Sequence, residues 1–284
     1  MTEGSLALDT AGDDTRFGFG ANWARFLKHL TDERIAEAER SLEGMLGEGY
    51  LKGRTFLDIG CGSGLFSLAA HRLGARQIRS FDFDADSAAC ATELRRRFAP
   101  DSTNWEVSRG DVLNPEFLES LGRWDIVYSW GVLHHTGDMW RALDNASQRV
   151  VDGGRLFISI YNNQGRRSAM WKGVKRTYNK LPTPLRRGYV AAVMLPREAL
   201  SLAAHSVRRK PLEYVHSWTE YRRNRGMSRW HDMVDWVGGY PFEVATPEEI
   251  FNFYRERGFL LQQMITCAGG LGCNQFVFEQ VPSS

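Results

Sequence analysis

The sequence predicts an α/β fold: a doubly wound, mostly parallel sheet of seven strands with an antiparallel C-terminal hairpin and an α-helical insertion. Three observations support it. Short apolar runs alternate with helical patterns, a glycine-rich turn follows the first run, and two apolar runs close the sequence. This alternation is typical of parallel sheets with helices on both faces. Because such crossovers are right-handed, we expect the loops after the strands to meet at one edge of the sheet.

The N-terminal region, residues 1–49, is expected to form a tail and helices that cover the ligand site. Residues 1–15 have no apolar periodicity and predict a frayed tail. Apolar side chains between positions 22 and 46 recur at helical spacing and predict one or two amphipathic helices. Thr31 or Asp32 is suited to cap the second of them.

The predicted core occupies residues 50–161 and 245–284. Helices are expected at residues 65–75 and 87–99, after the first two strands. The five strands of the first part are expected at residues 54–60, 77–83, 104–111, 123–130 and 154–161.

After residue 161 the alternation stops, and residues 162–244 predict a helical cap without strands. The core pattern returns at residues 246–259, where Thr246 and Glu249 have the spacing of a helix capping box. Two apolar runs at 260–267 and 274–281, joined by the segment AGGLG, then predict the closing hairpin.

The composition excludes several classes of protein. Of 284 residues, 43% are hydrophobic and 25% charged, and 36 Lys and Arg oppose 34 Asp and Glu, a net charge of +2. These values exclude intrinsic disorder and the coating of nucleic acid by bulk charge. Four scattered cysteines form neither a disulfide framework nor a zinc motif. Without a secretory signal or a long apolar run, we expect a reduced, cytoplasmic protein with no metal.

The most specific motif is FLDIGCGSG at residues 56–64, where the first strand meets the first helix. Glycines in such a turn allow a ligand to approach the backbone closely. The spacing G-x-G-x-G, followed by Leu65, differs from the G-x-G-x-x-G of dinucleotide-binding loops. Asp58 before the glycines suits a cationic ligand rather than a pyrophosphate, although it can also organise the turn by hydrogen bonds.

The segment 58–64, DIGCGSG, resembles motif I of the class I S-adenosylmethionine-dependent methyltransferases, which have a Rossmann-like fold. The resemblance implies S-adenosyl-L-methionine as cofactor, with its methionine end against the loop formed by Asp58, Gly60, Cys61, Gly62 and Gly64. This agrees with the motif's chemistry, because the cofactor carries a sulfonium and an ammonium group but no phosphate.

Two later segments resemble the same family in order and distance. Asp82 ends the second strand 18 positions after Gly64, and the resemblance implies that it binds the ribose hydroxyls, with Phe83 beside the adenine. Asp111 and Val112, in RGDVLNP, correspond to the segment that binds the adenine edge. Asp84 and Asp86 are expected to be helix caps.

Residues 124–138 and 150–161 resemble the family's motif IV region and fifth-strand turn, in the style of quinone-biosynthesis and other small-molecule methyltransferases. Together the similar segments cover about residues 50–161 and 245–284, and they identify no single member. The segment after the fourth strand lacks the N-P-P-Y pattern common in enzymes that methylate amino groups of bases.

Methyl transfer to a hydroxyl needs a base, and His134 and His135 lie just after the fourth strand. Either is a candidate catalytic base, but both can instead be structural. Trp130 is expected to line the methionine side of the cofactor or to pack in the core. Arg25, in the N-terminal region, is placed to meet the cofactor carboxylate.

The cap has a charge unlike the rest of the chain. Residues 162–244 contain 16 Lys and Arg but only 6 acids, a net +10 that is offset by −8 elsewhere. An insertion at this point lies over the active site and is expected to form a substrate lid. The charge can recognise an anionic acceptor, contact an acidic membrane surface, or form a solvated face.

Aromatic and polar side chains interleave in residues 213–244, as in pockets that bind a ring or a sugar and also in small helical cores. We expect at least one of four of these residues to contact the acceptor, namely Tyr221, Arg229, Trp230 and His231.

The sequence therefore predicts a methyltransferase that acts on a small or medium-sized, anionic acceptor, with O-methylation favoured over N- or C-methylation. Two alternatives remain open, an RNA methyltransferase and a non-catalytic cofactor-binding protein. Nucleic acid is expected to be an unlikely partner and peripheral membrane contact is possible, while the oligomeric state is not predicted.

Overall fold

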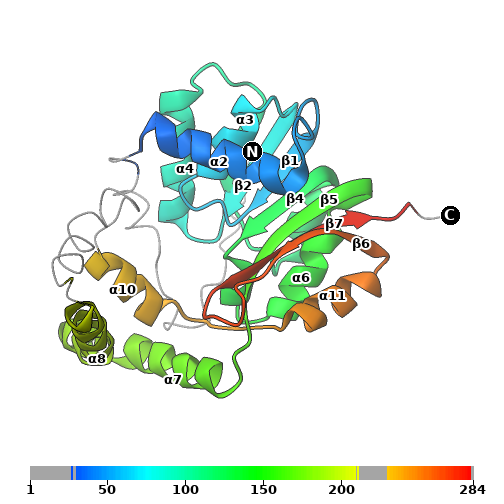
Figure 1. The fold of residues 1–284 in the computed structure, drawn as a ribbon. Coiled ribbons are helices and arrows are strands. Elements are labelled where there is room, and N and C mark those ends of the chain that lie inside the picture. Colours follow the sequence, from blue (N-terminus) through cyan, green and yellow to red (C-terminus); the bar gives the residue numbers. More distant parts are fainter. Residues whose placement is uncertain (1–26, 28–29, 209, 211–228, 283–284) are drawn as a thin grey trace, which may run out of the picture.

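The computed structural model describes residues 27, 30–208, 210 and 229–282, which include one seven-stranded sheet (Figure 1). The strands are β1 (Thr55–Ile59), β2 (Gln77–Asp82), β3 (Trp105–Arg109), β4 (Trp124–Trp130), β5 (Val150–Tyr161), β6 (Phe259–Ile265) and β7 (Cys273–Gln280). Their order is β3-β2-β1-β4-β5-β7-β6. Strands β1 to β5 are parallel, and β7 pairs antiparallel with both β5 and β6. The predicted sheet and its C-terminal antiparallel hairpin are confirmed.

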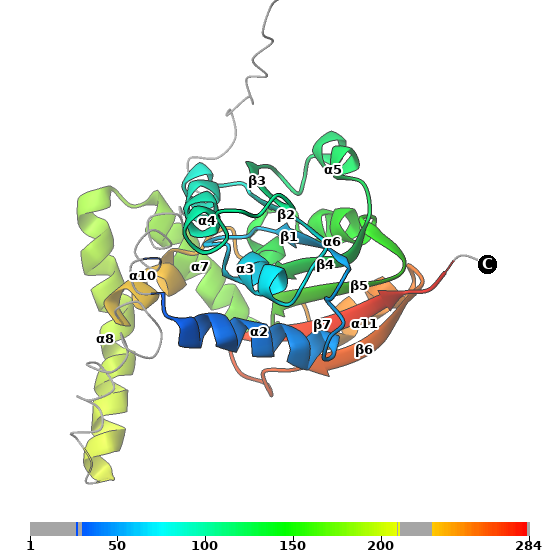
Figure 2. The same cartoon turned by 90° about the horizontal axis from the view of Figure 1, so that it is seen from above.

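Helices cover both faces of the sheet (Figure 2). One face packs against α2 (Asp32–Leu46), α3 (Leu65–Arg72) and α4 (Ala85–Phe98). The other packs against α5 (Pro115–Leu121), α6 (Met139–Ser147) and α11 (Pro247–Arg255). Successive side chains of a strand point to opposite faces, so Phe56 belongs to the first core and Leu57 to the second. Both are fully buried, as in a sheet covered on both sides.

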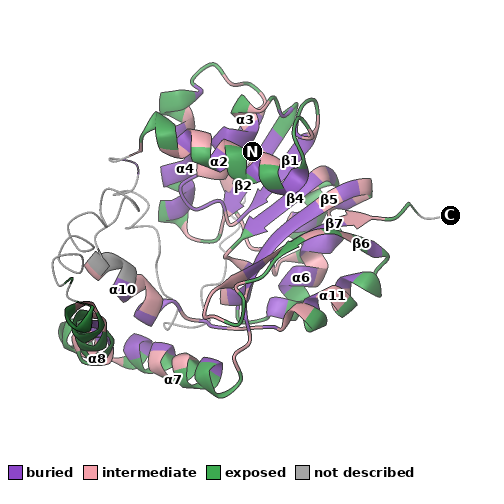
Figure 3. Ribbon diagram, viewed as in Figure 1, coloured by how far each residue is buried: buried purple, intermediate pink, exposed green. Residues whose placement is uncertain are grey.

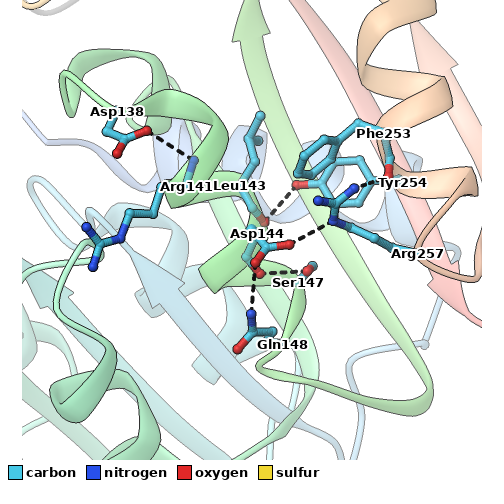
Figure 4. Close-up of polar contacts among 9 residues, drawn as sticks. All are labelled: Asp138, Arg141, Leu143, Asp144, Ser147, Gln148, Phe253, Tyr254 and Arg257. Atoms are coloured by element: carbon cyan, nitrogen blue, oxygen red, sulfur yellow. Dashed lines mark hydrogen bonds and ion pairs between the residues drawn. The ribbon is translucent and has the colours of Figure 1, made fainter.

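The last helix, α11, is fixed at both of its ends. The predicted capping box is present, because the Thr246 amide donates to Glu249 at 2.7 Å and the Glu249 amide donates to the Thr246 hydroxyl at 3.2 Å. Just beyond the helix, Arg257 donates to the Asp144 carboxylate of α6 at 2.7 Å and lies 3.6 Å above the Phe253 ring (Figure 4). These contacts align α11 with α6 beneath the sheet.

The insertion forms the predicted helical cap in its described part. It contains α7 (Arg166–Lys180), α8 (Thr183–Val207) and α10 (Arg229–Gly238). These helices surround a separate apolar cluster that includes Tyr178, Val190, Met194, Met233 and Val237. Figure 1 shows the cap beside the sheet, attached through the end of β5 and the segment before α11. None of the described helices is both long and apolar enough to cross a membrane.

Several boundaries differ from the prediction. β5 begins at Val150, because the chain keeps pairing with β4 through a bulge next to the Gly153–Gly154 pair that suggested a turn. Thr31 occupies the N-cap of α2 without a side-chain cap bond. Asp84 caps α4 as predicted by accepting from the Asp86 amide, whereas Asp86 itself lies within the first turn.

Candidate active site

A large cavity opens at the carboxyl ends of the parallel strands, between the sheet and the cap. Its volume is about 1530 Å³, above the roughly 300–1,000 Å³ of a site for one drug-sized ligand. The core lines it with the loops after β1, β2, β3 and β4 and with the β6–β7 turn. The cap lines it with side chains of α7, α8 and α10. One cavity therefore has room for two small molecules side by side.

The glycine loop after β1 forms one wall, and its glycines have different roles. Gly60, Gly62 and Gly64 have φ angles of 75°, 53° and 80°, a region that favours glycine. A Cβ on Gly60 would lie 2.3 Å from the Val132 side chain, so this turn needs glycine to pack against the loop after β4. A Cβ on Gly64 would meet Ala91 of α4 at 2.9 Å. Gly60, Cys61 and Gly62 line the cavity, while Gly64 serves helix packing instead.

Two carboxylates border this loop. Asp82, the last residue of β2, accepts hydrogen bonds from the Gly62 and Asp84 amides, both at 2.9 Å. Burial raises its pKa to about 6. Asp58, near the end of β1, is buried, accepts a hydrogen bond from the Ser67 hydroxyl, and has a pKa that burial raises to about 7.

The charge around these two acids is uncompensated by side chains. Within the described residues, no Lys, Arg or His forms an ion pair with Asp58 or Asp82. Tyr128 also lines the cavity, and its buried hydroxyl has no hydrogen-bond partner among the described residues. A positively charged ligand would stabilise both carboxylates, because an opposite charge favours their ionised form. This end of the cavity therefore fits a cation and not a phosphate.

The loops after β2 and β3 supply a flat, half-exposed surface. The Phe83 ring is 46% exposed, and the Arg109 guanidinium lies 5.7 Å from its centre. Asp111 accepts from the Leu113 amide at 2.8 Å, which holds the turn that follows β3. Phe83, Arg109, Asp111 and Val112 all line the cavity. Arg109 was not predicted, although it directly precedes the Gly-Asp pair that the sequence singled out.

Trp130 ends β4 on the same rim. Its indole is 44% exposed and donates to the Gln275 side chain of β7 at 3.2 Å. It lines the cavity rather than packing in the core.

The two adjacent histidines lie on a short 3-10 turn, Leu133–His135, with their ring centres 4.5 Å apart, but only one of them lines the cavity. His135 lines the cavity, and its Nδ1 lies 2.6 Å from the Pro241 carbonyl oxygen. Since a carbonyl only accepts, Nδ1 carries the proton and Nε2 is the basic nitrogen. Burial lowers the pKa of His135 to about 4, which keeps the ring neutral at pH 7.

His134 is fully buried and does not reach the described cavity wall. Its Nδ1 accepts from the Tyr161 amide at 3.3 Å, and burial holds its pKa well below the usual value. The structure thus brings His135 to the cavity and leaves His134 inside the protein, where its ring packs 4.1 Å from that of Tyr161.

The cap end of the cavity is aromatic. The rings of Tyr161 and Trp236 meet edge to face with centres 5.8 Å apart, and Trp171 meets Trp236 at 5.5 Å. Methionines complete this wall, at positions Met170, Met194 and Met233. Its charged members are Arg167, Arg197 and Asp235.

A buried lysine holds this aromatic wall in place. Lys175 of α7 is 1% exposed, donates to the Trp236 carbonyl, and lies 4.7 Å from the centre of the Trp236 ring. One turn later, Asn179 donates to the Gly238 carbonyl at 2.6 Å. Two side chains of α7 thereby bind the carbonyl end of α10, where positive charge is favourable. Burial nevertheless lowers the pKa of Lys175 to about 7.

Of the four acceptor residues expected from the sequence, Trp230 alone has a described side chain. Arg25 and Tyr221 lie outside the described residues, as do the side chains of Arg229 and His231 on α10. Trp230 packs against the apolar cluster of the cap and is absent from the cavity wall.

α10 contributes both to the cap core and to the cavity. Trp230 packs with Met233 and Val237 in the apolar cluster, and of these three only Met233 also lines the cavity. Trp236 reaches the cavity as well, together with Tyr240 and Pro241 after the helix. Trp236 and Tyr240 belong to the same aromatic stretch, residues 213–244, that the sequence singled out. Only the position of the cap shows which of its side chains reach the cavity.

Comparison with known proteins gives concordant matches. The family model described as a methyltransferase domain matches residues 23–230. The ubiquinone biosynthesis O-methyltransferase of Rhizobium etli is 28% identical over 185 residues, 60% of this chain and 71% of that protein. The tRNA U34 carboxymethyltransferase of an Enterobacter species is 27% identical over 176 residues, 59% of this chain and 45% of that protein. The chain thus spans less than half of this second relative.

The fold also resembles solved structures. Magnesium protoporphyrin IX methyltransferase from Synechocystis, solved with bound S-adenosylhomocysteine, superposes with a TM-score of 0.52 over 92% of this chain and 94% of that one, at 12% identity. At this identity the likeness concerns the fold. The tRNA-modifying relative means that the expectation of an unlikely nucleic-acid partner is not confirmed.

Proposed function

Because this chain belongs to the methyltransferase family whose domain model matches residues 23–230, we propose that it methylates a hydroxyl group of a small, anionic, ring-containing acceptor bound under the cap. S-adenosylmethionine-dependent methyl transfer follows from the family. The acceptor class is inferred from one observation: a single cavity joins an acidic glycine loop to an aromatic wall that carries two arginines.

The acidic end of the cavity is proposed to bind the cofactor. When bound, S-adenosylmethionine supplies an electrophilic methyl group on a positively charged sulfur. The buried carboxylates of Asp58 and Asp82 favour a cationic ligand, and the loop at Gly60 and Gly62 lets the cofactor approach the backbone closely. Phe83 and Asp111 supply an apolar surface and a hydrogen-bonding edge. Arg25 stays a prediction.

The aromatic end is proposed to bind the acceptor. Trp171, Trp236 and Tyr161 present ring faces and edges that favour a flat apolar group. Arg167 and Arg197 reach the same space from two helices and can pair with a carboxylate or phosphate. The cap side chains that line this end of the cavity are proposed to align the two reactants.

His135 is proposed to take the proton from the acceptor hydroxyl. It lines the cavity with its ring centre 5.6 Å from that of Tyr161, and the Pro241 carbonyl binds Nδ1, which leaves Nε2 as the basic nitrogen. With a pKa of about 4 the imidazole is neutral and ready to accept a proton over the whole physiological range. It is a weaker base than free imidazole, so positioning supplies much of the effect.

The direct test uses S-adenosylmethionine with a labelled methyl group and an extract of the cells that produce the protein. Label is expected to enter the small-molecule fraction in an Asp82-dependent manner, with Asp82→Ala as the inactive control. Label that enters only material sensitive to ribonuclease would instead establish an RNA acceptor. Cofactor binding without transfer to any fraction would establish the non-catalytic alternative.

An RNA acceptor has specific support in the tRNA-modifying relatives and the +10 charge of the cap. The two candidates differ in their dependence on salt. Binding of RNA releases counterions and weakens steeply between low and physiological salt, whereas a small anion that contacts two arginines is affected much less. The salt dependence of the acceptor KM therefore separates them.

The histidines provide a matched pair of variants. His135→Ala is expected to lower kcat by about 100-fold or more with unchanged cofactor affinity, a size usual for a general base. His134→Ala should lower the melting temperature, because it empties a buried site, while the folded fraction keeps its kcat. Full activity in His135→Ala would contradict the assignment.

A further inference from the structure

The longest cap helix, α8, carries an exposed apolar face that neither the cavity nor the core uses. Its inner side packs into the cap through Val190, Met194 and Glu198. Its outer side exposes large apolar side chains to 41–84% of their surface. These are Leu185, Leu195, Leu200, Leu202 and Val207, here called the α8 outer face.

The α8 outer face carries no charged residue, although Tyr189 within the same sector packs inward on the cap. At about 100° per residue, its five side chains occupy roughly 160° of the helix circumference. Alanines at positions 192, 199 and 203 fall in the same sector and are also exposed. Every charged residue of the helix falls outside this sector, including Arg186, Arg187 and Arg197. An apolar sector of this width normally faces a protein core, yet here it faces outward.

Position and charge limit what can cover this face. In Figure 2 the C-terminal half of α8 extends beyond α7 and α10, away from the sheet. From residue 183 to residue 210 the chain carries six cationic residues and a single acid, the buried Glu198. In a pair of symmetric α8 helices these cations would lie close to one another, so the charge opposes a second copy as the occupant. An anionic surface is complementary.

We propose that the α8 outer face docks on the surface of a bilayer that contains anionic phospholipid. The leucines and Val207 enter the boundary between headgroups and acyl chains, and the exposed Arg187 and Arg208 contact the phosphates, as in helices that lie in the plane of a membrane. The bilayer supplies both an apolar layer for the exposed leucines and negative charge for the exposed arginines.

Docking in this orientation places the cavity near the membrane. Met194 and Arg197 line the cavity from α8 itself, only a few residues from Leu195 and Leu200 on the outer face. An acceptor with an anionic group and an apolar body would then enter between the bilayer and the cap. Membrane docking does not depend on this route and can be tested without any acceptor.

The test measures flotation of the full chain with vesicles of phosphatidylcholine alone or mixed with phosphatidylglycerol. Wild type is expected to bind the mixed vesicles and to leave the neutral ones unbound. Leu200→Glu should reduce the partition coefficient at least tenfold, and Arg187→Gln about fivefold, the effect of one cation near an anionic membrane. Leu260→Glu, at a side chain of β6 that is 58% exposed, is the matched control and should bind as wild type does.

Three results would overturn the proposal. The first is a wild type that does not bind mixed vesicles, and the second is an equal loss of affinity in Leu200→Glu and Leu260→Glu. The third is a dimer, detected by light scattering, that Leu200→Glu dissociates, which would assign the face to a second copy. A melting temperature lowered by Leu200→Glu, without vesicle binding by wild type, would mean that another part of the chain covers it. Cofactor affinity, measured in parallel, keeps these outcomes separate from those for methyl transfer.

Discussion

The two ends of the cavity are built in opposite ways. The glycine-loop end consists of backbone and carboxylates from the ends of adjacent parallel strands, β1 and β2, and from the loop after β3. The cap end consists of Tyr161 at the end of β5 and of aromatic, methionine and arginine side chains from α7, α8 and the later helix α10. The first end depends on local turns and the second on how the cap packs. Specificity for the acceptor is therefore expected to change with the cap while the cofactor site stays constant.

The largest expected effect concerns the backbone of the loop end. Gly60→Ala places a methyl group 2.3 Å from Val132 at a φ of +75°, and we expect cofactor affinity to fall by about 100-fold or more (about 2.7 kcal/mol). Calorimetry measures it. Gly53→Ala is the control, because its φ is +73° with nothing within 4 Å of the added Cβ. Equal losses in both variants would attribute the effect to backbone strain alone.

Removal of one aromatic side chain at the cap end should change the binding of the acceptor and leave that of the cofactor unchanged. Trp236→Ala removes the ring that joins Tyr161 and Trp171, and we expect the acceptor KM to rise by about 10- to 100-fold, as for a central aromatic contact. The Kd of the cofactor should stay within about threefold. Trp140→Ala, on α6 and outside the cavity wall, should change neither constant. A parallel loss of cofactor affinity would mean that the two ends are not independent.

The affinity of the loop end for the cofactor should depend on pH, whereas the affinity of the cap end for the acceptor should not. Asp58 and Asp82 have pKa values raised to about 7 and about 6 by burial, and a cationic cofactor prefers their ionised forms. Affinity should therefore drop by about tenfold from about pH 8 to about pH 5.5. Asp82→Asn should flatten the lower part of this profile. A flat wild-type profile measured by calorimetry would refute a direct role of these charges.

The last effect concerns stability rather than ligand binding, and it tests the lysine that anchors the cap. Burial lowers the pKa of Lys175 from its usual 10.5 to about 7. Between these values the unfolded chain binds one more proton than the native protein, so this group makes the protein more stable as pH rises. Relative to Lys175→Met, the free energy of unfolding of the wild type should rise by up to about 1 kcal/mol per pH unit between about pH 7 and pH 10. Denaturant unfolding measures this gain. Parallel pH profiles for both proteins would show that the amine is solvated.

Local pattern was sufficient for most of the core. Each predicted strand is present within a few residues, and the capping box at Thr246 formed as its spacing required. Where the prediction differed, a non-local contact decided the result. β5 extends back to Val150 because Val150 pairs with Trp124 of β4. The glycines at 153 and 154 predict a turn there, so the sequence does not indicate this pairing.

The candidate site divides in the same way. Asp58, Gly60, Gly62 and Asp82 converge because adjacent parallel strands end side by side, so motif order along the chain is enough to bring them together. No comparable rule relates Trp171 to Trp236, 65 positions later, or ranks Trp236 above Trp230. Their roles depend on which side of α10 meets α7, and that is set by the buried contacts of Lys175 and Asn179.

The sequence by itself determined the α/β class, the glycine loop with its two acids, and the family. These features arise from hydrogen bonding and backbone geometry over a few consecutive residues. Only the tertiary structure decided that His135 faces the cavity while His134 is buried, and that α8 turns its leucines outward. Such choices depend on the packing of distant segments, where the burial of one side chain is fixed by the shape of its neighbours rather than by its place in the chain.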